Sequence, residues 1–249
     1  MRRLSPGSFD LVRRLTRAPA WKRALRLAVV LTVAIVALDS CWLAAHWPDW
    51  KKLARGPVPK SRFIEDWEDA HGRKAHWTPV TLEEIPERVV RAVLIAEDSN
   101  FFGHHGFDRE ALIAAWEKNL ARRKIVFGGS TLSQQTAKNL FLTPSRTPWR
   151  KWHEIVLTSA MERNLSKRRI LEIYLNDAEL GDGVYGFEAG ALEYDGVRVG
   201  DLSQEQAIDL AATLSGPKEN NPKTRTSRFR TRVETITHWL VLAGELEKP

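Results

Sequence analysis

The sequence predicts a mainly α-helical protein that carries one membrane-spanning segment. Three observations lead to this prediction. The chain has 249 residues, of which 43% are hydrophobic, so it is long enough to bury a sizeable core. Beyond Pro86 the apolar residues repeat at helical spacing, and no strand-like alternation continues far enough to build a sheet. Residues 24–45 form an apolar segment of the length that a membrane crossing needs, roughly 20 residues.

The positive charge of the chain is concentrated at its N-terminus. The formal net charge is +7. Residues 1–26 contain eight of the 38 basic residues and one of the 31 acidic residues, so this segment accounts for the whole excess. The neutral remainder gives no reason to expect nucleic acid as a partner. Cys41 is the single cysteine, which excludes an internal disulfide framework and a CxxC metal site.

Residues 24–45, ALRLAVVLTVAIVALDSCWLAA, are predicted to be an uncleaved membrane anchor. Tryptophans, which favour membrane interfaces, occur at both ends: Trp21, Trp42, Trp47 and Trp50. Arg26 and Asp39 interrupt the apolar run, so a buried core helix or a cleaved signal peptide is the alternative, but no small-x-small cleavage site follows. The preceding basic residues predict that residues 1–23 form a cytoplasmic tail, and that the chain beyond about residue 46 lies outside the inner membrane.

The segment after the anchor changes character near residue 79. Residues 46–78 are predicted to be a linker with short ordered pieces, because glycines, prolines and charges interrupt any sustained periodicity. Pro86 suits a helix N-terminus, and the valines and leucine that follow it repeat at helical spacing up to Glu97. A second amphipathic helix is predicted from Arg109 to Leu120.

The stretch AEDSNFFGHHGFD, residues 96–108, leads an apolar helix directly into two carboxylates, Glu97 and Asp98. A helix cap followed by a solvated loop is one interpretation of this pattern. The other is a carboxylate at the mouth of a cleft, where partial burial raises its pKa and makes it useful as a base.

The stretch GGSTLSQQTAKNLFLTP, residues 128–144, predicts a helix with a sharp entry. Thr131 and Gln134 fit a capping box, and Pro144 ends the helix. Gln134, Gln135 and Lys138 fall on one face, which suits a sugar or a phosphate. A plain amphipathic helix explains the same arrangement.

Residues 150–176 predict two further helices. Glu154 lies one turn after Arg150 and Lys151, so a carboxylate and two cations share one patch. An ordinary surface ion-pair cluster is the alternative, and taken alone it is the stronger one. Ser166 opens the next helix, whose apolar face is expected to lie in the core and comprises Ile170, Leu171, Tyr174 and Leu175.

Five segments occur in an order that is typical of one enzyme family. They are Glu97-Asp98-x-x-Phe101-x-x-His104-x-Gly106, GGSTLSQQTAKN, RKWHE, ERNLSKRRILEIYLN and GVYGFEAGA. Together they resemble the motif set of the peptidoglycan glycosyltransferases, which polymerise lipid II into glycan strands. The match runs from about residue 80 to 225. The resemblance implies a glycosyltransferase domain over residues 79–249, with a helical, lysozyme-like lobe and a smaller membrane-proximal jaw.

The resemblance also assigns roles to matched residues. Glu97 becomes the general base that deprotonates the 4-hydroxyl of the acceptor N-acetylglucosamine. Glu154 becomes the second carboxylate and assists departure of undecaprenyl pyrophosphate, directly or through a bound cation. The residues expected to bind the donor and to offset its phosphate charge are Ser130, Thr131, Gln134, Gln135, Lys138, Arg150 and Lys151. Those expected to support the site are Asp98, Phe101, His104, Gly106, Glu162 and Asn176.

Transfer of this kind inverts the anomeric carbon, so it needs a base on one side and charge stabilisation on the other. The resemblance implies no obligatory cofactor and no protein metal site, although Mg or Mn could bind at the pyrophosphate. The expected partners are lipid II, the growing glycan strand and the membrane. Proteins of cell division or elongation are further candidates. The catalytic domain is expected in the periplasm.

Three segments depart from the family pattern: Thr136 in place of an aliphatic residue, EYDG at 193–196 and LSGPKENNP at 214–222. They leave two alternatives open, a lysozyme-like lytic enzyme and a catalytically degenerate cell-wall assembly protein. Ser215 and Lys218 match the Ser-x-x-Lys motif of transpeptidases by letter only, because the other motifs of that domain are missing. A monofunctional enzyme is therefore expected.

Overall fold

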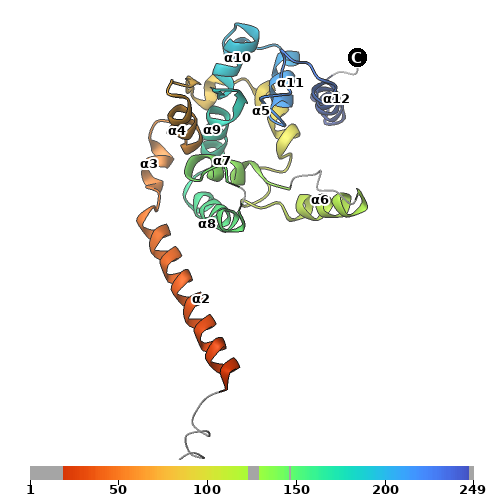
Figure 1. Cartoon of the computed structure of the whole chain (residues 1–249). Helices are drawn as coiled ribbons and strands as arrows, with labels where there is room; N and C mark the ends of the chain where they lie inside the picture. Colours follow the sequence, from red (N-terminus) through yellow and green to blue (C-terminus); the bar gives the residue numbers. More distant parts are fainter. Residues whose placement is uncertain (1–18, 123–128, 146, 247–249) are drawn as a thin grey trace, which may run out of the picture. The chain divides into compact units, whose positions relative to one another are not determined.

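The computed structural model describes residues 19–122, 129–145 and 147–246, and the chain divides into two units, Met1–Pro48 and Asp49–Pro249 (Figure 1). Most of the predicted cytoplasmic tail therefore lies outside the described residues. The first unit contains one long helix, α2 (Ala20–Ala45). The second unit contains the remaining helices and a small sheet.

Helix α2 has the length and composition of a membrane span. An 18-residue window of this 26-residue helix reaches a mean hydropathy of 2.2. At 1.5 Å per residue the helix is about 39 Å long, more than the roughly 30 Å of a bilayer's hydrocarbon core. None of its side chains is buried, which argues against the core-helix alternative. An N-terminal signal sequence meets the same test of length and composition. The helix thus fits a single-pass anchor, as the sequence predicted.

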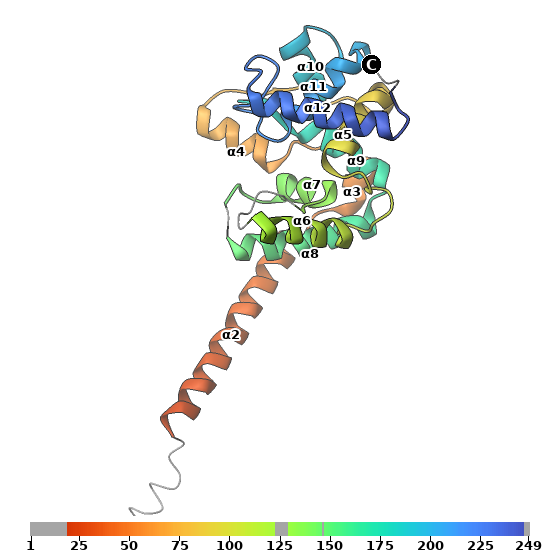
Figure 2. The ribbon, with the colours of Figure 1, turned by 90° about the vertical axis from the view of Figure 1, so that its right-hand side faces the viewer.

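The second unit is helical, as expected from the periodicity. Its α-helices are α3 (Trp50–Arg55), α4 (Arg62–His71), α5 (Glu87–Glu97), α6 (Arg109–Arg122), α7 (Leu132–Phe141), α8 (Pro148–Asn164), α9 (Lys167–Asp177), α10 (Phe187–Asp195), α11 (Gln204–Thr213) and α12 (Ser227–Leu242). Among the described residues, two short 3₁₀ helices also occur: η1 (Leu82–Glu84) precedes α5, and η2 (Val199–Asp201) lies between α10 and α11. In both views α5, α10, α11 and α12 gather in one group, and α6, α7 and α8 lie in another (Figures 1 and 2).

Three very short strands lie among the described residues of the second unit. They are β1 (His76–Trp77), β2 (Glu179–Gly181) and β3 (Val184–Tyr185), in the order β1-β3-β2. β1 pairs with β3 in parallel, with His76 opposite Val184, and β2 pairs with β3 in an antiparallel hairpin. Gly183 forms the turn of this hairpin at a φ of 76°, a backbone conformation that side chains disfavour.

The core of the second unit comprises one large apolar cluster and a small separate one around Ile64, Trp67 and Tyr185. Helix α5 buries Val89 and Val93 against α11 and α12, and α7 packs on α8 and α9. The predicted apolar face of α9 lies in this core, since Ile170, Leu171, Tyr174 and Leu175 are all buried. The predicted helix starts are also confirmed. Pro86 precedes α5, Thr131 and Gln134 form the capping box of α7, and the Ser166 hydroxyl caps α9.

The segment predicted as a linker, residues 46–78, contains more structure than the sequence suggested. Helices α3 and α4 both lie within it, and they bury Trp50, Ile64 and Trp67. The linker prediction failed because these helices are short and their packing partners are remote. Ile64 and Trp67, for instance, pack on Tyr185 of β3. A helix of two or three turns gains most of its stability from such contacts, which no local pattern reveals.

Candidate active site

Glu97 ends helix α5, where the buried apolar face of the helix meets a polar loop. Both carboxylate oxygens accept hydrogen bonds. Gln135 Nε2 donates to Oε2 at 3.1 Å from α7, and Arg232 Nη2 donates to Oε1 at 3.1 Å from α12. Burial raises the pKa of Glu97, and the positive charge of Arg232 is the strongest opposing influence. The carboxylate therefore combines a high proton affinity with a fixed orientation, as a general base requires.

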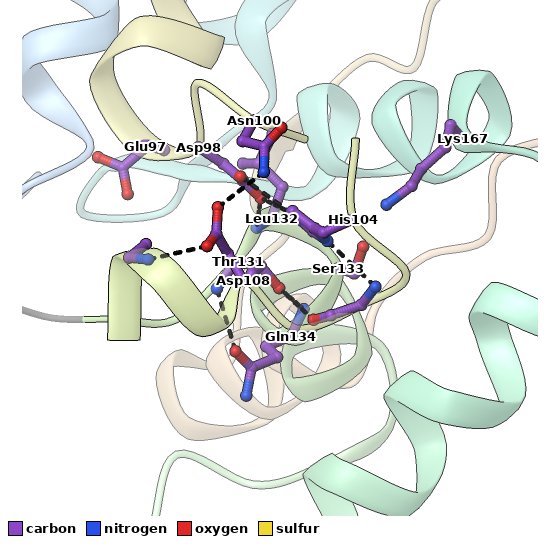
Figure 3. A network of polar contacts seen from close by, with 12 residues as sticks. Glu97, Asp98, Asn100, His104, Asp108, Thr131, Leu132, Ser133, Gln134 and Lys167 are labelled. Carbon is purple, nitrogen blue, oxygen red and sulfur yellow. Dashed lines mark hydrogen bonds and ion pairs between the residues drawn. The ribbon is translucent and has the colours of Figure 1, made fainter. Parts of the chain in front are cut away.

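The loop after Glu97 is held in shape by its own polar groups. His104 Nε2 lies 3.0 Å from both oxygens of Asp98, and Asp98 Oδ2 also accepts from the Leu132 amide at 2.9 Å. Gly106 N donates to His104 Nδ1 at 3.1 Å, so Nδ1 acts as an acceptor and the proton is on Nε2. Figure 3 shows Asp98 turned toward His104 and Leu132, whereas the Glu97 side chain points away from this network. Asp98 and His104 thus shape the loop, in line with the supporting role expected of them.

A hydrogen bond at Gly106 links this loop to the start of α7. Its φ is 90°, and a Cβ at this position would lie 3.1 Å from side-chain atoms of both Thr158 and Glu162. Its carbonyl oxygen accepts a hydrogen bond from Thr131 Oγ1 at 2.6 Å. The backbone conformation therefore favours glycine here, and a side chain would also have to displace Thr158 and Glu162 slightly.

Helix α7 lies between the two predicted catalytic carboxylates. Two successive glutamines contact them: Gln135 donates to Glu97, and Gln134 Nε2 lies 3.5 Å from Glu154 Oε1. Glu97 and Glu154 are far apart in the sequence and on different helices, so only the tertiary structure relates them through one helix. The helix lies between the two carboxylates and contacts each of them through one glutamine side chain.

Thr131 and Gln134 differ from the expectation that they line a donor cleft. Both are buried. The Thr131 hydroxyl accepts from Gln134 N and donates to Gly106 O, while Gln134 Oε1 accepts from Thr131 N. Because protein groups already use these atoms, the two residues hold the start of α7, and Gln134 also contacts Glu154. Ser130, by contrast, is exposed and Gln135 half-buried.

Glu154 lies in a buried cluster of charges. Its side chain is 3% exposed, and Arg150 Nη1 donates to Oε2 at 2.7 Å. Lys151 Nζ pairs with Oε1. The side chain of Arg150 is only 17% exposed, so the alternative of an ordinary surface ion pair does not describe this pair. Arg150 Nε is buried and has no hydrogen-bond partner among the described residues, which leaves one donor unused.

Lys138 of α7 completes the cluster. Burial lowers its pKa, and the negative charge of Glu154 is the strongest opposing influence. Its Nζ lies 5.3 Å from the centre of the Phe63 ring, a cation–π contact. With Arg150 and Lys151 the cluster holds three cations and one carboxylate. This excess of positive charge suits an anion with several oxygens, such as a pyrophosphate.

The remaining predicted support residues brace the surrounding elements. Glu162 pairs with Lys167 at 2.8 Å and accepts from the Ser133 hydroxyl. The Phe101 ring is buried, and Lys167 Nζ lies 4.3 Å from its centre. Asn176 bonds both the amide and the carbonyl of Val80, at 2.8 and 2.9 Å. None of these contacts involves the two catalytic candidates directly.

The residues around Glu154 fit a protein-held divalent cation poorly. No group of three or more His, Cys, Asp or Glu side chains suited to a metal ion occurs within residues 19–122, 129–145 and 147–246. Both Glu154 oxygens already face cationic side chains. A divalent cation at this position would have to be held by the oxygens of a bound pyrophosphate.

Arg232 and Tyr174 complete the surroundings of Glu97, and the sequence did not indicate their roles. Tyr174 OH lies 3.4 Å from Gln135 Oε1, on the side of the amide away from Glu97. Arg232 lies on the buried face of α12, three residues after Phe229 and four before Ile236, both of which are buried. The available signal in the sequence was a basic residue that helical spacing places on the same face as the apolar residues Phe229 and Ile236.

Comparisons with known proteins identify the family of this chain. A family model described as "Transglycosylase" matches residues 63–241. A biosynthetic peptidoglycan transglycosylase of Nitrosomonas eutropha is 43% identical over 195 residues, covering 76% of this chain and 79% of that protein. One from Methylobacillus flagellatus is 44% identical over 199 residues, covering 79% and 85%. One from Acinetobacter baylyi is 38% identical over 212 residues, covering 84% and 92%.

Proposed function

The chain belongs to the transglycosylase family and is an enzyme of peptidoglycan synthesis, and from this premise we propose that it polymerises lipid II into glycan strands. The observation that carries the proposal is the pair of carboxylates on either side of α7. Glu97 has a raised pKa, and Glu154 lies within three cations. A reaction that needs a base at one centre and stabilisation of a leaving anion at another matches this division.

In the proposed reaction Glu97 accepts the proton of the 4-hydroxyl of the acceptor N-acetylglucosamine. The hydroxyl oxygen then forms a bond to the anomeric carbon of the donor, and the bond from that carbon to the pyrophosphate oxygen breaks with inversion. Gln135 and Arg232 each occupy one lone pair of the Glu97 carboxylate, which leaves further lone pairs for the proton.

The cation cluster would stabilise the departing undecaprenyl pyrophosphate. Arg150 and Lys151 are held in place by Glu154, and the half-exposed Lys151 ammonium supplies a charge-assisted donor. A phosphate beside Lys138 would favour the charged form of that amine, which burial disfavours. Glu154 therefore acts by orienting cations, and a divalent ion carried by the substrate could add to the same charge.

We further propose that the enzyme has no transpeptidase activity. Ser215 and Lys218, the letter match to a transpeptidase motif, make other contacts. The Ser215 hydroxyl donates to Ala212 O at 3.2 Å, and Lys218 Nζ lies 3.5 Å from carboxylate oxygens of Glu179 and Asp182. Neither residue is arranged to activate the other.

The proposed location is the periplasmic face of the inner membrane, with α2 as the single anchor and the N-terminus in the cytoplasm. A membrane-proximal jaw is inferred from helix α6. Large apolar side chains are exposed along it: Leu112, Ile113, Trp116 and Leu120. Such a face is typical of a helix that lies in the membrane interface.

Labelled lipid II tests the proposal. The full chain in detergent should convert it to long strands, and Glu97→Gln should lower the rate by roughly 10²- to 10⁴-fold, because glutamine cannot take up a proton. Glu87→Gln is the matched control, since Glu87 lies on the same helix and its side chain is 76% exposed. Short cleaved fragments would indicate a lytic enzyme, and unchanged lipid II an inactive assembly protein. Wild-type polymerisation by Glu97→Gln would refute the role of Glu97.

A further inference from the structure

We propose that Arg232 of α12 is a positioning residue for Glu97, which it orients and keeps charged so that the carboxylate can take the acceptor's proton. The inference rests on the proposed role of Glu97 as the base. It assigns a function to a helix that contains none of the motifs found in the sequence. It also identifies one specific contact by which the C-terminal part of the chain controls the reaction.

The geometry fixes the Glu97 carboxylate between two helices. Arg232 Nη2 reaches Oε1 at 3.1 Å from α12, and Gln135 Nε2 reaches Oε2 at 3.1 Å from α7. Arg232 Nη2 also donates to the carbonyl oxygen of Ala96, the residue that precedes Glu97. The same nitrogen thus holds both the backbone and the side chain at the end of α5. A carboxylate with one donor on each oxygen cannot rotate freely, and it retains lone pairs for a proton.

The side chain of Arg232 is directed to Glu97 even though this placement buries part of its charged guanidinium group. Arginines on a helix usually extend toward solvent, but Arg232 lies in the buried register of Phe229 and Ile236. Its Nε is buried without a hydrogen-bond partner among the described residues. Glu97 is the only carboxylate with which it forms an ion pair within the described part of the chain. An arginine that served solubility or general surface charge would not be held in this way.

The charge of Arg232 also determines how readily Glu97 ionises. Burial raises the pKa of Glu97, and the negative charge of Asp98 adds to that effect. Arg232 opposes both, and the hydrogen bond from Gln135 helps it. Tyr174 of α9 stays neutral, because burial raises its pKa well above the usual range. Helix α11, which also packs on α5, contributes no charged group among those that act on Glu97. Without Arg232 a larger fraction of Glu97 would be protonated at neutral pH and unable to act as a base.

The rate of polymerisation measured against pH tests this inference. Arg232→Gln should lower kcat at neutral pH at least tenfold, and the rising limb of the profile should move to higher pH by about one unit or more. Part of the lost rate should return as the pH is raised. Arg230→Gln is the matched control, because Arg230 lies two residues away on α12, is exposed, and its side chain bonds the carbonyl of Arg225. Its profile should equal that of the wild type.

The outcomes separate this inference from the proposed function. An Arg232→Gln enzyme whose rising limb coincides with that of the wild type would overturn the role of Arg232, even if its rate or stability had fallen. If Glu97→Gln is fully active, the proposed function of Glu97 fails instead. Should Arg232→Gln not fold, Arg232→Lys provides the test. Lysine keeps the positive charge and can donate to both oxygens from one nitrogen, as Nη2 does, so Arg232→Lys should keep the rising limb at its wild-type position. A limb displaced by about one unit or more in that variant would overturn the role of the charge.

Discussion

Arg150→Ala should destabilise the second unit far more than removal of a surface arginine. In the structure Arg150 Nη1 bonds Oε2 of a Glu154 side chain that is 3% exposed. Loss of one partner of a fully buried pair typically costs about 3 to 5 kcal/mol. Lys151 and Gln134 still contact the other oxygen, Oε1, so only one charge-assisted bond is lost. We therefore expect a loss of about 2 to 3 kcal/mol in the free energy of unfolding.

Thermal unfolding of the detergent-solubilised full chain measures this effect. For a unit of about 200 residues each kcal/mol corresponds to roughly 2 to 4 °C, so Tm should fall by about 4 to 12 °C. Arg168→Ala is the matched control. Arg168 forms an ion pair of 3.0 Å with Glu83, but both side chains are more than two-thirds exposed. Its loss should cost no more than about 0.5 kcal/mol.

The double variant Arg150→Ala with Glu154→Gln identifies the cause. If the cost comes from an unpaired buried charge, a neutral glutamine at position 154 should remove much of it, and the two changes should not be additive. Equal effects of Arg150→Ala and Arg168→Ala on Tm would refute the reasoning. That result would return Arg150, Lys151 and Glu154 to the ordinary surface cluster that the sequence also allowed.

Three further predictions follow from individual residues. Gly106→Ala should lower stability by about 1 to 3 kcal/mol, because a φ of 90° strains a residue with a Cβ and the new Cβ would press on Thr158 and Glu162 at 3.1 Å. Gly196→Ala, at a φ of 69° with open space around it, is the control for strain alone and should cost less. Burial raises the pKa of Asp177 from 3.8 to about 7, so between these values the folded chain binds a proton that the unfolded chain does not, and stability falls as the pH rises. Asp177→Asn should therefore raise Tm at pH 8 and lose this advantage toward pH 5, and a pH-independent difference would contradict the assignment. Trp116→Ser on α6 should lower activity on lipid II in liposomes more than in detergent, whereas Trp239→Ser on α12, also an exposed tryptophan, should not distinguish the two.

Local sequence pattern determined most of the helices and the identity of the chemical groups. The capping box of Thr131 and Gln134 and the Ser166 cap depend on atoms within one helical turn, so their letters suffice to predict them. The same holds for the apolar face of α9, since helical periodicity is a local property. The resemblance of the ordered motifs to one enzyme family then indicated Glu97 and Glu154 as the candidate catalytic residues.

Contacts between remote segments decided the rest. The packing of Ile64 and Trp67 on Tyr185 makes α4 part of the core. The side chains of Thr131 and Gln134, which were expected to face substrate, instead form hydrogen bonds with other protein groups. The proton affinity of Glu97 depends on burial by several helices and on the charge of Arg232, which is 135 residues further along the chain. Burial and Coulomb interactions act through space, and their strength depends on distances that only the folded chain defines. The sequence, through its resemblance to the family, could therefore indicate a candidate base, whereas only the tertiary structure shows which residues hold that carboxylate in place.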